Sequence, residues 1–394
     1  MNRENIEKAL KMLLEEICIT IGERPTGSKN NRQLENFARS YFEARGCEVE
    51  TQKFKCIDWE NRGAKLFFAG KELNVRPSYY STACNLEAEY ITLRTVAELG
   101  TSNLQGRIAV LHDELTEEQL MPKGFTFYNP EEHQKIISLL EEKEPLAVIT
   151  VVDDDTSIFE DGDFNIPSAY ISREEGEAIL QGEGKVKLEI NTRRKDARGA
   201  NLIARINPAK NKKLVVTAHL DTKYGTPGAL DNGTGVAILL LLSSLIKPEE
   251  IDFLLELLLL NGEDYYSTPG QLKYREEYIT GNEETFLVIN CDGVGLKESK
   301  TAVSFLGLSK NREAFFEKLI SKREGIDLIE PWEMGDHMLF VRKGIPALTI
   351  TSKEILRLID VIAHTERDSL DIVDYDEVIK AVELVAEVVK AVRV

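Results

Sequence analysis

The stretch that most constrains the fold runs from an apolar segment at 214–216 to a glycine-rich turn that contains Asp231. The apolar segment is typical of a buried strand and leads directly into His219 and Asp221. After the turn, 236–246 is apolar and long enough for a helix that packs against the strand. Ligands of open α/β sheets bind beyond the carboxyl ends of the strands, where these polar side chains fall. We therefore expect His219 and Asp231 to be the first two ligands of a metal site.

From residue 200 onward, apolar runs alternate with helical patterns. This alternation predicts an α/β fold with a mostly parallel central sheet and helices on both faces. The closing helix is expected at 375–392, with Asp374 and Glu377 forming a capping box at its start. The strand candidates are 202–206, 214–218, 251–260, 285–290, 302–306 and 347–351.

The middle of the chain has a different pattern, with short strand-like pieces after residue 56. Its only histidines, His112 and His133, are expected at the surface, and a polar linker follows at 192–199. We predict a catalytic domain made of 1–56 and 193–394. A β-rich domain without chemistry of its own is predicted to be inserted at 57–192.

Composition narrows the choice of partners and compartment. The net charge of −18 argues against nucleic acid or an anionic membrane as a partner. No apolar run approaches the ~18 residues that span a bilayer, and no secretory signal is recognised. The five cysteines are odd in number and lack CxxC spacing, which is typical of reduced thiols in a cytoplasmic protein. Association into a homo-oligomer is left open.

Polar residues follow one predicted strand after another. Two imidazoles with several carboxylates suit Zn²⁺ better than Ca²⁺ or Mg²⁺, which prefer oxygen ligands. There are enough ligands for two metal ions that share one carboxylate, with another carboxylate left to move a proton. The pattern predicts a metal-assisted hydrolase. The residues are His219, Asp221, Glu263, Asp264, Asp292 and, in a late loop, His364.

Several of these residues have ordinary structural alternatives. Asp231 could be the N-cap of the helix that opens near residue 233. Cys291, beside Asp292, points to the opposite face of its strand and is expected to be a core thiol. Asp336 and His337 are candidates for a substrate pocket, with a structural role for His337 equally open.

Six blocks of sequence, in this order, resemble the signatures of the co-catalytic zinc aminopeptidases (metallopeptidase family 28). This family also includes glutamate carboxypeptidases and glutaminyl cyclases. The turn at 23–28 is similar to the family as well, and the middle region resembles an inserted protease-associated domain. The blocks are His219-Leu-Asp221, Gly228-Ala-Leu-Asp231-Asn232-Gly233-Thr-Gly235, Asn261-Gly-Glu263-Asp264, Asn290-Cys-Asp292-Gly293-Val-Gly295, Gly335-Asp336-His337-Met-Leu-Phe340 and His364-Thr…Asp368-Ser.

The resemblance implies a role for each residue. Asp231 would bridge two zinc ions, one completed by His219 and Asp292 and the other by Asp264 and His364. Glu263 matches the general base, and Asp221 the acid that orients His219. The chain departs from the family twice: Asp264 stands where most members have Glu, and Ala363 where many have Tyr.

The function implied is a cytoplasmic aminopeptidase with two zinc ions, for which cobalt or manganese could substitute. Peptides would be its substrates, and the inserted domain suggests short ones. The alternatives are a carboxypeptidase, a glutaminyl cyclase that needs only one zinc, and a non-catalytic binding protein on the same scaffold.

Overall fold

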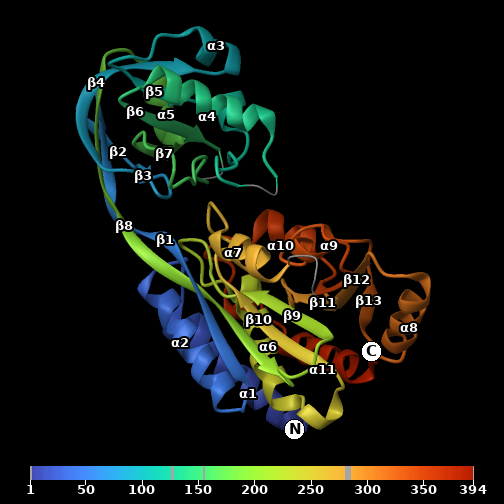
Figure 1. Cartoon of the computed structure of the whole chain (residues 1–394). Coiled ribbons are helices and arrows are strands. Elements are labelled where there is room, and N and C mark those ends of the chain that lie inside the picture. The colour runs from blue at the N-terminus through green and yellow to red at the C-terminus, as the bar shows by residue number, and fades with distance from the viewer. Residues whose placement is uncertain (1, 126–127, 154–155, 280–284, 394) are drawn as a thin grey trace. The chain divides into compact units, whose positions relative to one another are not determined.

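The computed structural model describes residues 2–125, 128–153, 156–279 and 285–393 (Figure 1). The chain forms two compact units, one made of 1–56 with 197–394 and the other of 57–196. The strands are β1 (Glu48–Phe68), β2 (Lys71–Leu73), β3 (Arg76–Pro77), β4 (Cys84–Leu93), β5 (Ile108–Leu111), β6 (Ala147–Val152), β7 (Ser168–Ser172), β8 (Lys185–Ile206), β9 (Lys213–His219), β10 (Leu254–Leu260), β11 (Thr285–Cys291), β12 (Thr301–Leu306), β13 (Ile326–Leu328) and β14 (Ala347–Ser352). The α-helices are α1 (Arg3–Glu15), α2 (Lys29–Glu43), α3 (Val96–Thr101), α4 (Glu131–Lys143), α5 (Arg173–Leu180), α6 (Thr234–Leu245), α7 (Pro269–Tyr278), α8 (Lys310–Ile320), α9 (Met338–Val341), α10 (Ile355–Val361) and α11 (Tyr375–Ala391).

The larger unit is built on a mixed sheet in the order β13-β12-β14-β11-β9-β10-β8. Four central strands, β10, β9, β11 and β14, are mutually parallel, so their carboxyl ends lie at one edge. The flanking strands β8 and β12 run antiparallel to their neighbours. The predicted α/β class, with a mostly parallel central sheet, is confirmed.

The central strands present two different faces because their side chains alternate. On one face, Leu214, Val216 and Ala218 of β9 join the apolar core of the unit. Helix α6 packs against β9 and β10 and also contacts α1 and α11, which Figure 1 shows on the same side of the sheet. Cys291 is fully buried in this core, as predicted for a packed thiol.

The opposite face of the same strands is much more polar. Helix α7 covers it, and Tyr274 of α7 donates a hydrogen bond of 2.5 Å to the buried carboxylate of Glu256 on β10. Lys213 on β9 lies 3.4 Å from the same carboxylate. This face also carries Thr217 and His219, so the alternation that buries the core directs His219 away from it.

The segment expected to be a polar linker at 192–199 is part of β8, a strand of 22 residues that pairs with β1. The boundary between the two units does fall in this segment, between residues 196 and 197, but the segment is extended strand with most side chains exposed or half-buried. A strand with little apolar burial lacks the alternation by which sequence reveals strands.

The smaller unit has a sheet in the order β4-β5-β6-β7-β3, with β4 to β7 parallel. Its strands are buried on both faces: Ala109 and Leu111 of β5 join one apolar cluster, and Ile108 and Val110 join another. Helices α3 and α4 contribute to the first cluster and α5 to the second. The unit is therefore an α/β sheet as well.

Three smaller expectations were wrong. His112 and His133 are buried, with 8% and 4% of their surface exposed. The Nδ1 atom of His133 accepts a hydrogen bond from the main chain of Met121, which fixes the ring inside the unit. At the start of α11, Asp374 caps the helix, but Glu377 does not complete a capping box because its carboxylate accepts hydrogen bonds from Thr301 instead.

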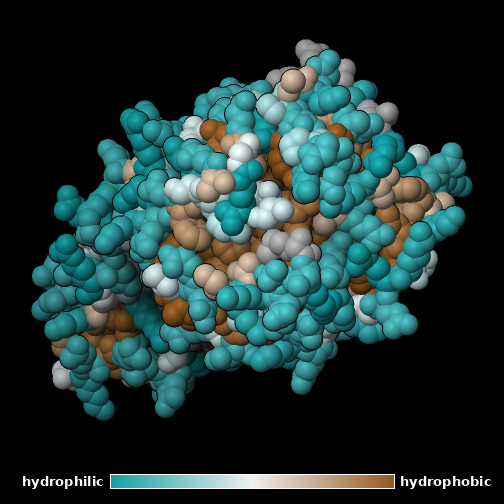
Figure 2. Space-filling view, turned by 90° about the horizontal axis from the view of Figure 1, so that it is seen from below, coloured by the Kyte–Doolittle hydropathy of each residue, from teal (hydrophilic) through white to brown (hydrophobic). Residues whose placement is uncertain are grey.

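The face drawn in Figure 2 is mainly hydrophilic, and apolar side chains gather on it in separate patches. Within the described residues, no helix is both long and apolar enough to cross a membrane. All five cysteines are free thiols.

Helix α2 is tied to the sheet of the larger unit by a buried carboxylate. Glu35 accepts hydrogen bonds from the main-chain N–H of Ala200 (2.8 Å) and from Nδ2 of Asn261 (2.9 Å). Burial is the main cause that raises the pKa of Glu35 from 4.5 to about 7. The folded state therefore holds a proton at Glu35 that the unfolded chain releases near pH 4.5.

This raised pKa predicts a pH-dependent loss of stability. The free energy of unfolding that protonated Glu35 contributes is fully present below about pH 4.5 and is lost as the pH rises through about 7. Glu35→Gln keeps an acceptor oxygen but does not ionise, so the drop in free energy of unfolding between pH 5 and 8 should shrink by about 3 kcal/mol. Urea denaturation at both pH values measures this. The exposed Glu43→Gln on the same helix serves as control, and an unchanged drop in Glu35→Gln would contradict the argument.

Candidate metal centre

The candidate residues gather at the carboxyl edge of the four parallel strands of the larger unit. His219 is the last residue of β9, Glu263 and Asp264 follow β10, and Asp292 follows β11. Asp231 lies in the short helical turn η3 (Ala229–Gly233) that precedes α6. His364 lies in the loop after α10, which itself follows β14. The parallel order of the strands thus brings residues far apart in sequence to one place.

The first group of potential ligands consists of His219, Asp231 and Asp292. Their ligand atoms all lie within 4.8 Å of one another. The Nε2 atom of His219 is 2.9 Å from Oδ1 of Asp231 and 3.8 Å from Oδ2 of Asp292. All three residues are buried, so the group is shielded from solvent.

The second group consists of Asp231, Asp264 and His364, again within 4.8 Å. The Nε2 atom of His364 is 3.1 Å from Oδ2 of Asp231 and 3.0 Å from Oδ1 of Asp264. Asp231 therefore belongs to both groups, and its two oxygens face different histidines. A carboxylate in this arrangement can coordinate two cations at once, one through each oxygen.

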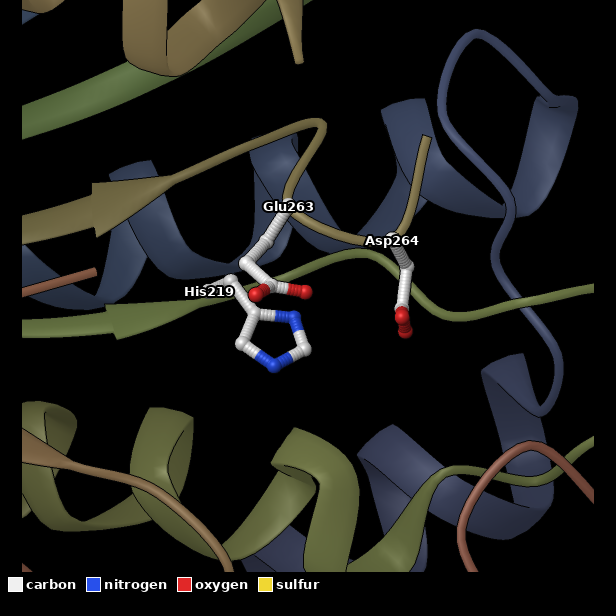
Figure 3. Close-up of side chains that lie close together, drawn as sticks. All are labelled: His219, Glu263 and Asp264. Carbon is white, nitrogen blue, oxygen red and sulfur yellow. The ribbon is translucent and has the colours of Figure 1, made fainter. Parts of the chain in front are cut away.

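Glu263 belongs to neither of these groups but lies beside the first. Its carboxylate is within 4.8 Å of His219 and Asp264, and Figure 3 shows it next to the His219 ring. Asp221 lies beneath, with Oδ1 at 3.7 Å from Nδ1 of His219. The two oxygens of Asp221 also accept hydrogen bonds from the main-chain N–H groups of Glu263 (3.3 Å) and Asp264 (3.2 Å).

The electrostatics of the site reflect an excess of buried negative charge. Burial, reinforced by neighbouring carboxylates, raises the pKa of Glu263 and of Asp292 well above their usual values, and it raises that of Asp264 too. Asp231 is the exception: burial opposes its ionisation, but interactions with the two histidines hold its pKa low. Burial would also lower the pKa of His219, yet the surrounding carboxylates raise it far above normal.

The donor set fits a metal ion. Both ring nitrogens of His219 and the Oδ2 atom of Asp264 are buried and make no hydrogen bond within the described part of the chain. Buried polar atoms of this kind are costly unless a partner satisfies them. A cation would supply that partner and offset the repulsion among the carboxylates, and two imidazoles favour zinc over calcium or magnesium.

Comparison with known proteins agrees with this geometry. The model for "Peptidase family M28" matches residues 201–389, which include all five residues of the two groups and Glu263. This part of the chain, just under half of its length, is similar to peptidase family M28. The resemblance seen in the sequence blocks is thereby confirmed.

Individual proteins are similar to the chain in sequence or in fold. Aminopeptidase YwaD of Bacillus subtilis is 29% identical over 248 residues, which cover 58% of this chain and 52% of the relative, or about half its length. The structure of BSAP, a zinc aminopeptidase from Bacillus subtilis, has a TM-score of 0.76 at 21% identity and covers 98% and 95% of the two chains. A glutaminyl cyclase of Bacteroides thetaiotaomicron, bound to N-acetylhistamine, gives 0.54 at 12% identity and covers 100% and 98%. At these identities the two structures establish the fold.

The loop with Asp336 and His337 packs beside the candidate ligands. His337 is fully buried; its Nε2 atom donates to the carbonyl of Trp332 (2.8 Å), and Nδ1 accepts from Asn290 (3.3 Å). These bonds favour a structural role for His337. Asp336 is 1% exposed and accepts a hydrogen bond from Gln271 of α7. Burial raises the pKa of Asp336 to about 6, and a contact of either residue with substrate stays a prediction.

The alternative role of Asp231 as the N-cap of α6 is not seen, and a neighbouring side chain bonds to the start of this helix instead. Asn232 accepts the N–H of Gly235 through Oδ1 (3.0 Å), while the carboxylate of Asp231 faces the histidines. Because Asn and Asp are both good caps, the sequence alone did not distinguish them.

Two residues of the site were not assigned a role from the sequence. The carboxylate of Asp368 accepts the main-chain N–H groups of Leu230 (2.7 Å) and Asp231 (3.0 Å), so it holds the turn that carries Asp231. Arg24 is fully buried and contacts the same turn through the carbonyl of Gly228. Both stand in blocks that resemble the family, which was the only available signal, since polar residues in turns usually face solvent.

The role of Asp368 predicts a loss of stability on substitution. Asp368→Asn leaves one of the two N–H groups facing an amide NH₂, which cannot accept a hydrogen bond. The free energy of unfolding at neutral pH should fall by about 2 kcal/mol, the usual range for hydrogen bonds to a charged group. Urea denaturation gives the measurement. The exposed neighbour Asp371→Asn should stay close to wild type, and equal values for the two variants would refute the role.

Proposed function

We propose that the chain is a metallo-aminopeptidase that removes N-terminal residues from peptides with two zinc ions. The observation that carries this proposal is the position of Asp231 between two separate groups of one histidine and one further carboxylate. The match of residues 201–389 to peptidase family M28 supports it, as do the names of similar proteins, an aminopeptidase and a zinc aminopeptidase.

The two groups supply one ligand set each. His219, Asp231 and Asp292 would hold one zinc ion, and Asp231, Asp264 and His364 would hold the other. When bound, zinc supplies Lewis-acid chemistry, because it polarises a carbonyl and lowers the pKa of water toward ~7. Cobalt or manganese could take the same positions, since ligand sets of this type select weakly among such ions.

Glu263 is the residue proposed to move the proton. It stands outside both ligand groups but within reach of them, as a general base for an attacking water must. Its raised pKa favours accepting a proton. The carboxylic acid then returns the proton to the amine that leaves when the peptide bond breaks. Asp221 orients the His219 ring from behind.

Two features distinguish this chain within the proposed mechanism. The arm of Asp264 is one methylene shorter than that of the Glu usual in the family, and it still reaches His364 at 3.0 Å. The buried Ala363 has no side-chain donor where many relatives carry a tyrosine, so no side chain is assigned to oxyanion stabilisation.

The proposal also includes the smaller unit and the compartment. We assign the insert to the protease-associated type on its resemblance in sequence and its position within the peptidase chain. A cytoplasmic location is supported by five free thiols, which is usual where the environment is reducing.

A substrate panel tests the proposed activity. Aminoacyl reporters with a free amine should be hydrolysed, whereas their N-acetylated forms should not, because an aminopeptidase requires the free N-terminus. A chelator should abolish the activity, and zinc should restore it. Release of product by absorbance is the measurement.

Each rival function gives a different result in the same panel. Cleavage of N-acetylated peptides at a free carboxyl end would favour a carboxypeptidase. Cyclisation of N-terminal glutamine with one zinc per chain would favour a glutaminyl cyclase. Chain that stays free of metal in zinc-supplemented medium and turns over no substrate would favour a binding protein.

The role of Glu263 is tested separately. Glu263→Gln keeps the size of the side chain but cannot accept the proton, so kcat should fall by roughly 10²–10⁴-fold, the usual contribution of a general base. Zinc content by elemental analysis should remain at the wild-type level. Glu276→Gln, an exposed substitution on α7, serves as control. A rate close to wild type for Glu263→Gln would remove Glu263 from the mechanism.

A further inference from the structure

Arg24, in the turn at residues 23–28, has an unusual environment for an arginine. It is fully buried, and within the described residues its guanidinium donates only to main-chain carbonyl oxygens. Burial lowers the pKa of the guanidinium, yet an arginine remains charged at neutral pH. A buried charge without a paired carboxylate is costly, so its position calls for an explanation other than an ion pair.

The carbonyls that Arg24 contacts belong to the two segments that carry the candidate ligands. Its Nε donates to Leu220 (2.8 Å), the residue between His219 and Asp221. Nη1 and Nη2 donate to Pro227 and Gly228 (2.8 Å each), which begin the turn leading to Asp231. One rigid guanidinium therefore joins the strand end that holds His219 to the turn that holds Asp231.

Thr26 makes a second connection from the same turn. Its hydroxyl donates to Oδ2 of Asp221 at 2.8 Å, and Asp221 lies behind His219. The turn itself is held in place because the main-chain N–H of Arg24 donates to Thr222 (3.0 Å) and Asn31 donates to the carbonyl of Arg24 (3.1 Å). The turn that carries Arg24 and Thr26 is therefore held in place, as are the segments that these two residues contact.

The packing around Gly228 leaves the turn no room to adjust. A Cβ atom at Gly228 would lie 2.3 Å from Cγ2 of Thr222, 2.6 Å from the carbonyl oxygen of Asp231 and 3.3 Å from Nη2 of Arg24. Gly228 also has a φ of 59°, which glycine adopts easily. The backbone at Gly228 therefore packs closely against the guanidinium of Arg24 and has no room to shift independently of it.

We propose that Arg24 and Thr26 are positioning residues that set the spacing between His219 and Asp231 and thereby the affinity of the metal site. The inference rests on the proposed metal-dependent function. It reaches outside the part of the chain that matches the family model, which begins at residue 201. Partners of this kind, which hold ligands without touching the metal, typically contribute 10–100-fold to metal affinity.

Titration of the metal-free full-length chain with Co²⁺ tests the proposal, because the visible absorption of bound cobalt reports ligand geometry. Arg24→Lys keeps the charge but loses the planar fork, so it cannot hold both segments. We expect its affinity for Co²⁺ to fall roughly 10–100-fold and its spectrum to change. With zinc in excess, kcat should fall more than KM rises. Arg205→Lys, which alters another largely buried arginine of the same unit, is the matched control and should bind Co²⁺ as wild type does.

Thr26→Val gives an independent test that does not depend on the folding of Arg24→Lys. Valine keeps the shape of the side chain and removes the hydrogen bond to Asp221 (2.8 Å), together with a longer one to Asn261 (3.3 Å). We expect a fall of about 10-fold in Co²⁺ affinity, at the lower end of the range for such partners. Thr222→Val and Arg32→Gln are not suitable controls, since Thr222 and Arg32 both bind the same turn. The exposed Thr20→Val is the matched control and should bind Co²⁺ as wild type does.

The outcomes separate this inference from the proposed function. If wild type binds two Co²⁺ ions and the Arg24 and Thr26 variants bind them with the same affinity and spectrum, the positioning role is overturned and the function stands. If wild type binds no metal, the proposed function fails, and the inference fails with it. If Arg24→Lys does not fold, the affinity of Thr26→Val alone decides.

Discussion

Repulsion among buried carboxylates is the interaction on which the candidate site depends. The buried Asp231, Asp264 and Asp292 and the half-buried Glu263 lie close to two imidazoles, and burial makes each uncompensated charge expensive. The raised pKa values of three of these carboxylates express that cost. Strand ends hold His219 and Asp292, and buried hydrogen bonds to Asp368 hold the turn of Asp231. Bound cations would convert the repulsion into attraction.

The sheet brings the carboxylates together, and its apolar core also stabilises the unit against their repulsion. Its four parallel strands end at one edge, so polar residues after each strand converge. One face of the strands is apolar and packs on α6, and this core stabilises the unit. The other face carries polar residues that fasten α7 through Tyr274 and Glu256. One face of the sheet therefore contributes mainly to stability, and the other carries polar residues that include His219.

The sequence predicted the α/β class and the residues that meet at the strand ends, because apolar runs and the polar residues after them are local patterns. It did not predict the contributions of Arg24 and Asp368, whose partners lie 196 and 138 residues away. Nor did it distinguish Asp231 from Asn232 as a cap, or show that His133 is buried. Each of these depends on tertiary contacts, which leave no periodic signal in the chain. Substrate preference likewise depends on surfaces that no local pattern encodes.

The alternation of β9 has a consequence for how such a chain can change over evolutionary time. Ala218 and His219 are adjacent, but one packs in the core and the other faces the site. A single inserted or deleted residue within β9 would exchange the faces of every side chain beyond it, placing an imidazole in the core and a methyl group among the acids. Loops after the strands carry no such constraint. Length variation should therefore accumulate in the loops of this family, while the strands that carry ligands keep their length.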